Sequence, residues 1–218
     1  ADGMIAGGTE SMSIMSQMMG NQIAMNPAFF EKDENLAIAY GMGLTAERIA
    51  AQRAISRDDQ DAFAQASHQK ACAAIKAGHF AAEISSYAVK LRVPDLKTGE
   101  VIVKDFLAET DEGPRPDSSL ERLARLKPVF AAQGSVTAGN SSQMSDGAAA
   151  VLLVSEKILK QFNLKPLARF AGYSVAGVAP QIMGIGPVEA IPRVLKQAGV
   201  HQQDVDWFEL NEAFAAQS

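Results

Sequence analysis

Short apolar runs bounded by glycine, proline and polar residues predict the extended parts of this chain. The opening residues "DGMIAGGTESMS" fit a short buried strand that ends in a turn. "ISSYAVKLRV" (84–93) and "EVIVKDFL" (100–107) flank "PDLKTG", which has the composition of a turn, so we expect two strands there. "AAAVLLV" (148–154) is apolar throughout and is expected to be a buried run.

Two helices are predicted where apolar residues recur at helical spacing. Thr45 fits the N-cap of a helix that runs to about Arg53, with an apolar stripe at Ala46, Ile49 and Ala50. Ser56 and Asp59 fit a capping box, and the helix that they open runs toward Gly78. We expect the apolar face of this second helix to consist of Ala62, Phe63, Ala66, Ala73 and Ala77.

Strand-like and helical segments alternate in the last third of the chain. Ser155 can cap a short helix, and "ARFAGYSVAG" (168–177) has the composition of a strand. Pro187 fits the first turn of a helix that Gly199 ends, and "VDWFEL" (205–210) completes the order strand, helix, strand. This alternation is typical of a layered α/β domain, whereas the middle third indicates an insertion rich in helices and loops.

Composition excludes several classes of protein. A net charge of −5 argues against a nucleic-acid-binding protein that relies on a broad basic face. The single cysteine excludes an internal disulfide framework, which fits a reducing compartment. No apolar run reaches the roughly 20 residues that a membrane-spanning helix needs, and no signal-peptide pattern is visible at the start. We therefore expect a soluble cytoplasmic protein.

The pair His68 and Cys72 lies four residues apart on a predicted helix, so the two side chains share a face. A thiolate–imidazole dyad or half of a metal site would use this spacing. No third ligand or orienting acid is evident, so we interpret Cys72 as a packing residue and expect no metal site.

Two loops rich in small residues are candidates for close approach to a ligand. "MGIGP" (183–187) places glycines before a helix, although it lacks the third glycine of a dinucleotide fingerprint and also fits a plain helix entry. "TAGNSSQMSDGAAA" (137–150) gathers hydroxyl, amide and carboxylate groups among small residues, which suits a backbone that passes close to a ligand or another chain. A turn with capping side chains explains the same composition.

Asn211 and Glu212 follow the predicted strand 205–210, where a small-residue helix is expected to begin. Polar groups at the end of a buried strand need partners. An amide there can orient a water or donate to a developing oxyanion, and it can equally serve as an N-cap. The two roles are compatible.

Seven stretches in this order resemble the thiolase family of acyl-CoA acyltransferases. They are "GGTESMS", "YGMGLTAERIA", "ISRDDQDAFAQASHQKA", "RLKPVF", "VTAGNSSQMSDGAAA", "MGIGP" and "NEAFAAQ", and together they extend over nearly the whole chain. The resemblance implies thiolytic cleavage of 3-ketoacyl-CoA by CoA in fatty-acid degradation, or the reverse Claisen condensation. CoA and acyl-CoA would be substrates, and no bound cofactor is implied.

The resemblance also implies what these 218 residues do not contain. The nucleophilic cysteine of the family, in a Cys-x-Ser-Gly motif, would precede them, and the histidine and second cysteine motifs would follow. Cys72 matches neither cysteine. We therefore expect the isolated chain to be inactive. The alternative function is that of a CoA-binding or oligomer-forming fragment without turnover.

Site residues carry over from the resemblance by position. Asn211 matches the asparagine that holds the water of an oxyanion hole. Residues that would line the acyl pocket and the CoA groove are Met42, Arg115, Phe130, Ala138, Ser142, Met183, Ala213 and Phe214. Gly41 stands where short-chain biosynthetic members often carry histidine, so we favour a degradative enzyme that accepts longer acyl groups.

The fold implied by the resemblance is a partial layered α/β/α/β/α architecture with an inserted helix- and loop-rich domain. Residues 1–14 and 143–163 would belong to the N-terminal half, 15–142 to the inserted domain that binds CoA and makes oligomer contacts, and 164–218 to the start of the C-terminal half. The resemblance also implies a homodimer or homotetramer.

Overall fold

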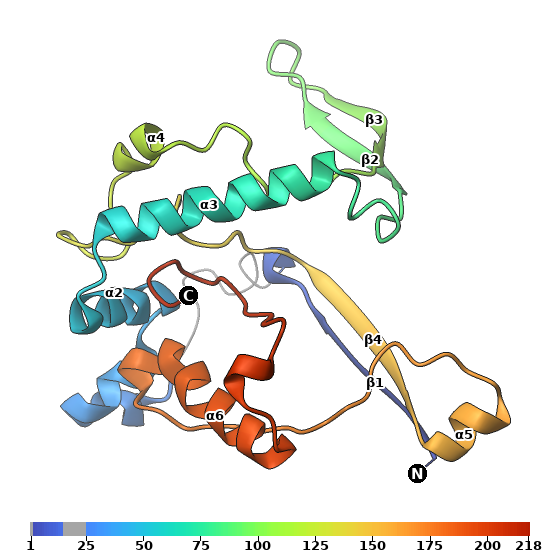
Figure 1. Cartoon of the computed structure of the whole chain (residues 1–218). Coiled ribbons are helices and arrows are strands. Elements are labelled where there is room, and N and C mark those ends of the chain that lie inside the picture. Colours follow the sequence, from blue (N-terminus) through green and yellow to red (C-terminus); the bar gives the residue numbers. More distant parts are fainter. Residues whose placement is uncertain (1, 15–24) are drawn as a thin grey trace.

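The structure is a computed structural model that describes residues 2–14 and 25–218 (Figure 1). The predicted start of the inserted domain at residue 15 lies outside the described residues. In chain order the elements are β1 (Gly3–Glu10), the 3₁₀ helices η1 (Pro27–Phe30) and η2 (Asp33–Ala39), α2 (Met42–Arg53), α3 (Arg57–Lys76), β2 (Tyr87–Pro94), β3 (Val101–Ala108), α4 (Leu120–Ala124), β4 (Gly147–Val154), α5 (Glu156–Gln161), η3 (Pro180–Ile185), α6 (Gly186–Ala198) and η4 (Gln202–Asp204).

β1 and β4 form an antiparallel pair whose register runs from Gly3 opposite Val154 to Glu10 opposite Gly147. The strand expected at the start of the chain is therefore present, and the apolar run 148–154 is a strand as well. The burial expected for both is wrong, because all residues of β1 and nearly all of β4 are exposed. The pair extends away from α2 and α3, and the described residues supply no further strand beside it (Figure 1). Its apolar side chains consequently face solvent.

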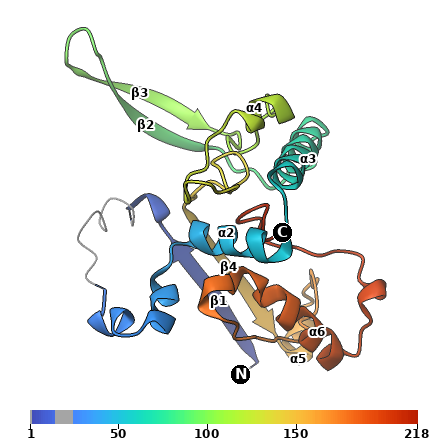
Figure 2. The same cartoon turned by 90° about the vertical axis from the view of Figure 1, so that its left-hand side faces the viewer.

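The hairpin predicted around "PDLKTG" is confirmed. β2 and β3 pair antiparallel from Tyr87 opposite Ala108 to Pro94 opposite Val101. In the turn, the Asp95 carboxylate accepts a hydrogen bond from the Lys97 N–H at 2.8 Å, and Gly99 has a φ of 74°, a conformation that favours glycine. Figure 2 shows the hairpin projecting from the rest of the molecule.

The helix predicted to start after Thr45 begins earlier, at Met42, with Gly41 at the N-cap position. Thr45 lies inside the first turn, and its hydroxyl donates to the Met42 carbonyl at 2.7 Å instead of capping the helix. The apolar stripe of α2 is confirmed, because Ala46, Ile49 and Ala50 are all buried. Small residues on this stripe permit close contact with η3.

α3 starts with the predicted capping box. The Ser56 hydroxyl accepts from the Asp59 N–H, and the Asp59 carboxylate accepts from the Ser56 N–H. Gly78 follows the helix with a φ of 75°, as a glycine after a helix end often does.

The expected apolar face of α3 is wrong in part. Ala62, Ala73 and Ala77 are exposed, and Phe63 and Ala66 are half-buried. The buried residues of this helix are Gln60, Asp61 and Ala64. The helix is rotated so that polar side chains face the loop 135–142, where they find hydrogen-bond partners. Polar contacts, and not alanine packing, therefore determine which face is covered.

A small core joins α2 to the end of the chain. Ala46 and Ala50 pack with Val136 and Ala216, and Ile55 and Phe214 pack against this cluster. The core therefore holds the loop 135–142 and the last residues of the chain against the same helix.

The helices predicted in the last third are present, but its strands are not. Ser155 caps α5, Pro187 lies in the first turn of α6, and Gly199 ends α6 with a φ of 68°. Segments 168–177 and 205–210 have no regular secondary structure, and the helix expected after Glu212 is a single turn. A strand requires a neighbouring strand for its backbone groups, and among the described residues these two segments have none. No helix in the described part of the chain is long and apolar enough to cross a membrane.

Candidate functional site

The loop 137–142 and the segment 211–216 lie side by side through backbone hydrogen bonds. The Ser142 N–H donates to the Ala213 carbonyl at 2.9 Å, and the Ala215 N–H donates to the Asn140 carbonyl at 2.9 Å. Ser141 and Phe214 are paired as an isolated antiparallel bridge between these two contacts. Residues that are 71 to 75 positions apart in the sequence are thereby fixed in one register.

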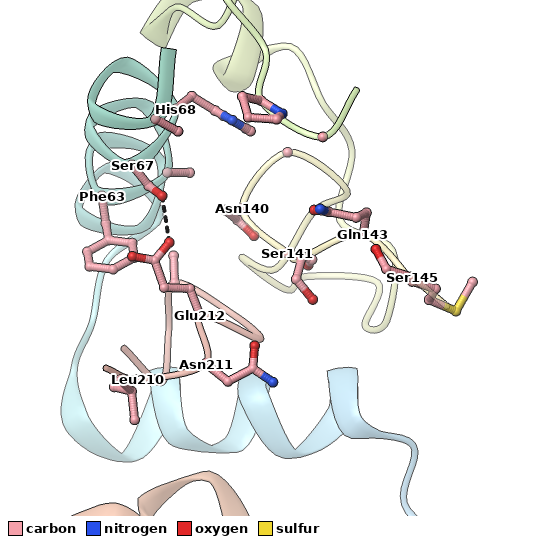
Figure 3. A pocket seen from close by; sticks show the side chains of 18 of the residues that line it. Phe63, Ser67, His68, Asn140, Ser141, Gln143, Ser145, Leu210, Asn211 and Glu212 are labelled. Carbon is pink, nitrogen blue, oxygen red and sulfur yellow. Dashed lines mark hydrogen bonds between the residues drawn. The ribbon is translucent and has the colours of Figure 1, made fainter. Parts of the chain in front are cut away.

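A cavity of about 820 Å³ opens beside this junction (Figure 3). Its walls come from α3, from residues 111–114, from the loop 139–145 and from the segment 209–215. Figure 3 shows Asn211 and Glu212 on one segment, Ser141 and Gln143 on another, and Ser67 and His68 along α3. Hydroxyl, amide, imidazole and carboxylate groups therefore share the wall with apolar side chains such as Phe63 and Leu210.

Asn211 and Ser142 are two predicted site residues that the structure brings to this cavity. The backbone hydrogen bond from Ser142 to Ala213 holds Ser142 and Asn211 on two neighbouring segments of the chain. The side-chain amide of Asn211 makes no hydrogen bond to any described residue, whereas the backbone carbonyl of Asn211 accepts from the Ala213 N–H at 2.9 Å. The amide is therefore available to a water or a ligand in the cavity.

Phe214 and Phe130 meet edge to face beside the cavity. Their ring centroids lie 6.0 Å apart at an interplanar angle of 84°. The Phe130 ring also covers Gly43 so closely that a Cβ at that position would lie 2.2 Å from the ring. Met42 precedes this glycine and is exposed at the start of α2. Phe130 therefore packs between Gly43 and Phe214, and none of the three predicted residues Met42, Phe130 and Phe214 lines the cavity.

Arg115 lies at the edge of the cavity through its backbone. Its N–H donates to Nδ1 of His68 at 3.2 Å, while its guanidinium is exposed and lies 3.5 Å from the Asp117 carboxylate. Because Nδ1 of His68 accepts this hydrogen bond, the ring proton of a neutral His68 is on Nε2.

Ala138 and Met183 do not line the cavity. Ala138 is exposed on the loop between the buried Thr137 and Gly139. Met183 is exposed on η3. The residue after it, Gly184, packs so tightly that a Cβ there would lie 2.8 Å from Ile49. Met183 was predicted to contact the end of the acyl group, but in the described part of the chain it does not lie on the cavity that Asn211 lines.

Sequence reasoning missed a contact across the cavity. The Ser67 hydroxyl donates to the Glu212 carboxylate at 2.5 Å and joins α3 to the residue after Asn211 (Figure 3). Sequence reasoning placed Asn140 among the hydrogen-bonding groups of the loop 137–150 but did not predict that this amide is buried. The partners in both contacts are polar residues of α3, which occur at helical spacing among its alanines. The same pattern fits an exposed helix face equally well, so it did not predict the contacts.

The pair His68 and Cys72 does not form a dyad, because Nδ1 of His68 accepts from the Arg115 backbone. Cys72 is half-buried on α3. Across the described ranges, no cluster of three or more His, Cys, Asp or Glu side chains is placed to hold a metal ion.

Asp146 connects the two strands β1 and β4 at the end nearest the cavity. Its carboxylate accepts from the Ser13 hydroxyl at 2.6 Å and from the Ser13 N–H at 2.9 Å. The hydroxyl first and the backbone N–H second lower the pKa of Asp146 below its ordinary value of 3.8. The neighbours of these two residues, Met12 and Ser145, line the cavity.

Comparisons with known proteins place the chain in a family. Residues 1–157 match the family model of the thiolase N-terminal domain, and residues 164–218 match that of the thiolase C-terminal domain. The chain belongs to the thiolase family.

Curated relatives agree with this assignment. The chain is 48% identical over 220 residues to the 3-ketoacyl-CoA thiolase of Bacillus subtilis, covering 100% of this chain and 54% of the relative. It is 46% identical over 214 residues to the peroxisomal 3-ketoacyl-CoA thiolase A of Rattus norvegicus, covering 98% of this chain and 48% of the relative. The chain thus spans about half the length of these relatives.

Solved structures confirm the α/β thiolase fold expected from the sequence. The dimeric peroxisomal thiolase of Saccharomyces cerevisiae superposes with a TM-score of 0.83 at 39% identity, covering 99% of this chain and 52% of that one. Human mitochondrial 3-ketoacyl-CoA thiolase superposes with a TM-score of 0.77 at 39% identity, covering 100% of this chain and 54% of that one.

Proposed function

We propose that these residues form the central part of an acyl-CoA C-acyltransferase that cleaves 3-ketoacyl-CoA with CoA, or catalyses the reverse condensation. The observation that carries the proposal is the cavity shared by Asn211 and Ser142, whose backbones are joined through Ala213. An unpaired amide and a hydroxyl facing one cavity suit a substrate with a thioester at one end and amide groups along its arm.

In this proposal Asn211 holds a water that donates a hydrogen bond to the thioester oxygen of the acyl-CoA. Negative charge develops on this oxygen when the α-proton is removed, and a prepositioned donor stabilises that charge more than it stabilises the ground state. The second donor would be the family histidine, which is outside these residues. One such donor typically accounts for a factor of about 10²–10³ in kcat.

The CoA groove would extend from Ser142 toward the inserted region. Ser142 would bind a pantetheine amide, and Met42, Phe130 and Ala138 would contact the same arm. Arg115 would lie at the nucleotide end, where an exposed guanidinium suits the adenine face and the phosphates. Ala213 and Phe214 would border the acyl group.

The remaining assignments of the sequence analysis belong to this proposal. Residues 1–14 with 143–163, residues 15–142 and residues 164–218 would form the N-terminal half, the inserted domain and the start of the C-terminal half. The complete protein would be a cytoplasmic homodimer or homotetramer in fatty-acid degradation. It would take CoA and acyl-CoA as substrates without a bound cofactor.

The test compares the isolated chain with the complete enzyme that contains it. We expect the complete enzyme to cleave acetoacetyl-CoA in the presence of CoA and the isolated chain to show no turnover, because its only cysteine, Cys72, is half-buried on α3 and does not line the cavity. Thiolysis by the purified 218 residues, or none by the complete enzyme, contradicts the proposal.

The acyl range has a separate test. A Cβ on Gly41 would have no atom within 4 Å, which leaves space beside Met42 for a longer acyl group. We expect turnover of six-carbon and longer ketoacyl-CoA substrates, and a strict preference for the four-carbon substrate would contradict this part.

A further inference from the structure

The side-chain amide of Asn140 is buried and makes three hydrogen bonds. Only 3% of this residue is exposed. Its Oδ1 accepts from the Thr137 N–H at 2.7 Å, and its Nδ2 donates to Asp61 Oδ1 at 3.0 Å and to the Ser135 carbonyl at 3.1 Å. Both hydrogens of the amide nitrogen are used, so the amide has one orientation in this site.

Asp61, the acceptor on α3, is itself held in place. It is 3% exposed, and its second carboxylate oxygen accepts from Arg57 Nε at 2.7 Å. The same guanidinium donates to the Leu123 carbonyl at 2.5 Å, at the end of α4. A buried carboxylate needs this kind of pairing, and the arrangement fixes the direction in which Asp61 faces Asn140.

The backbone of Asn140 joins this buried contact to the residues that line the cavity. Its carbonyl accepts from the Ala215 N–H, and two residues later the Ser142 N–H donates to the Ala213 carbonyl. The amide of Asn140 therefore determines the register between the loop that carries Ser142 and the segment that carries Asn211.

The start of the same loop has separate anchors. The Glu47 carboxylate on α2 accepts from the Ser135 N–H at 2.9 Å and from the Val136 N–H at 2.9 Å. Gln60 Nε2 donates to the Ser135 hydroxyl at 2.9 Å. A change at Asn140 removes its own hydrogen bond to the Ser135 carbonyl, but the contacts of Glu47 and Gln60 keep Ser135 and Val136 attached. Its main effect is therefore expected on residues 137–142.

We propose that Asn140 and Asp61 are positioning residues for catalysis: their buried amide–carboxylate contact sets the distance between Ser142 and Asn211. This inference rests on the proposed function, because it assigns to the pair the alignment of the CoA-binding and oxyanion groups of that same site. Neither side chain touches the substrate in this account.

The chemistry of the contact offers a test that separates alignment from simple space filling. In Asn140→Asp the new carboxylate keeps the shape of the amide and still accepts from the Thr137 N–H, but it faces the Asp61 carboxylate and the Ser135 carbonyl without a donor. Two carboxylates at this distance repel each other, and a proton shared between them restores a hydrogen bond. The charged groups around the pair are Arg57 on α3 and Glu47 on α2, and both are unchanged in the variant.

The experiment measures kcat/KM for acetoacetyl-CoA thiolysis by the complete enzyme between pH 6 and 8, with circular dichroism to verify folding. We expect Asn140→Asp to lower kcat/KM by about 10- to 100-fold at pH 8, and we expect the deficit relative to wild type to shrink toward pH 6. Asp58→Asn, an exposed change on the same helix, is the matched control and is expected to match wild type at every pH.

Each outcome decides the inference. A folded Asn140→Asp enzyme with wild-type kcat/KM, or with a deficit that is the same at all pH values, overturns it. If Asn140→Asp does not fold, the double variant Asp61→Asn with Asn140→Asp replaces it. It restores a donor between the two positions and removes the pair of facing carboxylates. A value of kcat/KM within about threefold of wild type at both pH 6 and pH 8 supports the inference, whereas a loss of about tenfold or more at both pH values overturns it. Absence of thiolysis by the wild-type enzyme overturns the proposed function instead.

Discussion

The Ser67 hydroxyl donates a hydrogen bond to the Glu212 carboxylate at 2.5 Å, although the two residues are 145 positions apart. This contact crosses one end of the cavity and ties the middle of α3 to the residue that follows Asn211. The position of the proposed oxyanion group therefore depends on a helix that contributes no catalytic residue.

Ser67→Ala in the complete enzyme is expected to lower kcat/KM by about three- to tenfold, because a hydrogen bond of this type contributes about 1 kcal/mol. Ser67→Thr keeps the hydroxyl and is expected to retain most of the activity. A double-mutant cycle with Glu212→Ala checks that the two side chains act together, since the second change should then add little. Equal losses for the alanine and threonine variants would show that the hydroxyl has no such role.

Gly43→Ala tests the packing of Phe130. A Cβ at this position would lie 2.2 Å from the ring, so the ring must move and its edge-to-face contact with Phe214 is lost. Overpacking of this kind costs about 1–3 kcal/mol, which opposes and exceeds the roughly 1 kcal/mol that alanine gains over glycine in a helix.

The matched control for this change is Gly186→Ala at the start of α6, where a Cβ would have no atom within 4 Å. We expect urea unfolding to give a lower midpoint for Gly43→Ala and an unchanged or higher midpoint for Gly186→Ala. A stabilised Gly43→Ala protein would contradict the packing described for Phe130.

Protonation of Asp146 is expected to weaken the connection between β1 and β4. The Ser13 hydroxyl and N–H lower the pKa of Asp146 in the folded protein, so the stability from this contact is present above the ordinary value of 3.8 and is lost as the pH falls below it. Urea unfolding between pH 6 and 3 should show a smaller loss on acidification for Ser13→Ala than for wild type. Identical acid dependence would mean that the contact does not contribute to stability.

Ser142→Ala addresses the CoA groove separately from the chemistry. If the Ser142 hydroxyl binds a pantetheine amide, its removal should raise KM for CoA by about three- to tenfold and leave kcat nearly unchanged. Steady-state kinetics at varied CoA concentration separate the two constants. A fall in kcat with unchanged KM would assign Ser142 to the reacting end instead.

Local signals in the sequence were sufficient for elements that depend on neighbouring residues. The Ser56–Asp59 capping box, the turn at Gly99 and the end of α6 at Gly199 all follow from side-chain and backbone chemistry within a few positions. These elements form as predicted because nothing distant is needed to start or end them.

The strands predicted at 168–177 and 205–210 are wrong because a strand depends on distant residues. Their apolar composition is that of strands, but a strand forms only beside another strand, and no partner is present among the described residues. β1 and β4 do form a pair, but they are exposed because the described residues cover neither face of it.

The site was predictable only as far as the resemblance extended. Asn211 and Ser142 were named and do lie on one cavity, whereas Met183 was named and lies elsewhere. The partners of Asn140 and Glu212, which are Asp61 and Ser67, were not predicted, because a polar residue with a distant partner has the same local sequence as one that is exposed to water.

The most direct test of the account is the turnover number of Asn211→Ala in the complete enzyme. Because the amide is proposed to hold the water that stabilises the thioester oxygen, kcat for acetoacetyl-CoA thiolysis should fall by about 100- to 1,000-fold while KM for CoA changes less than about threefold. A folded Asn211→Ala enzyme with kcat within about twofold of wild type would contradict the central claim.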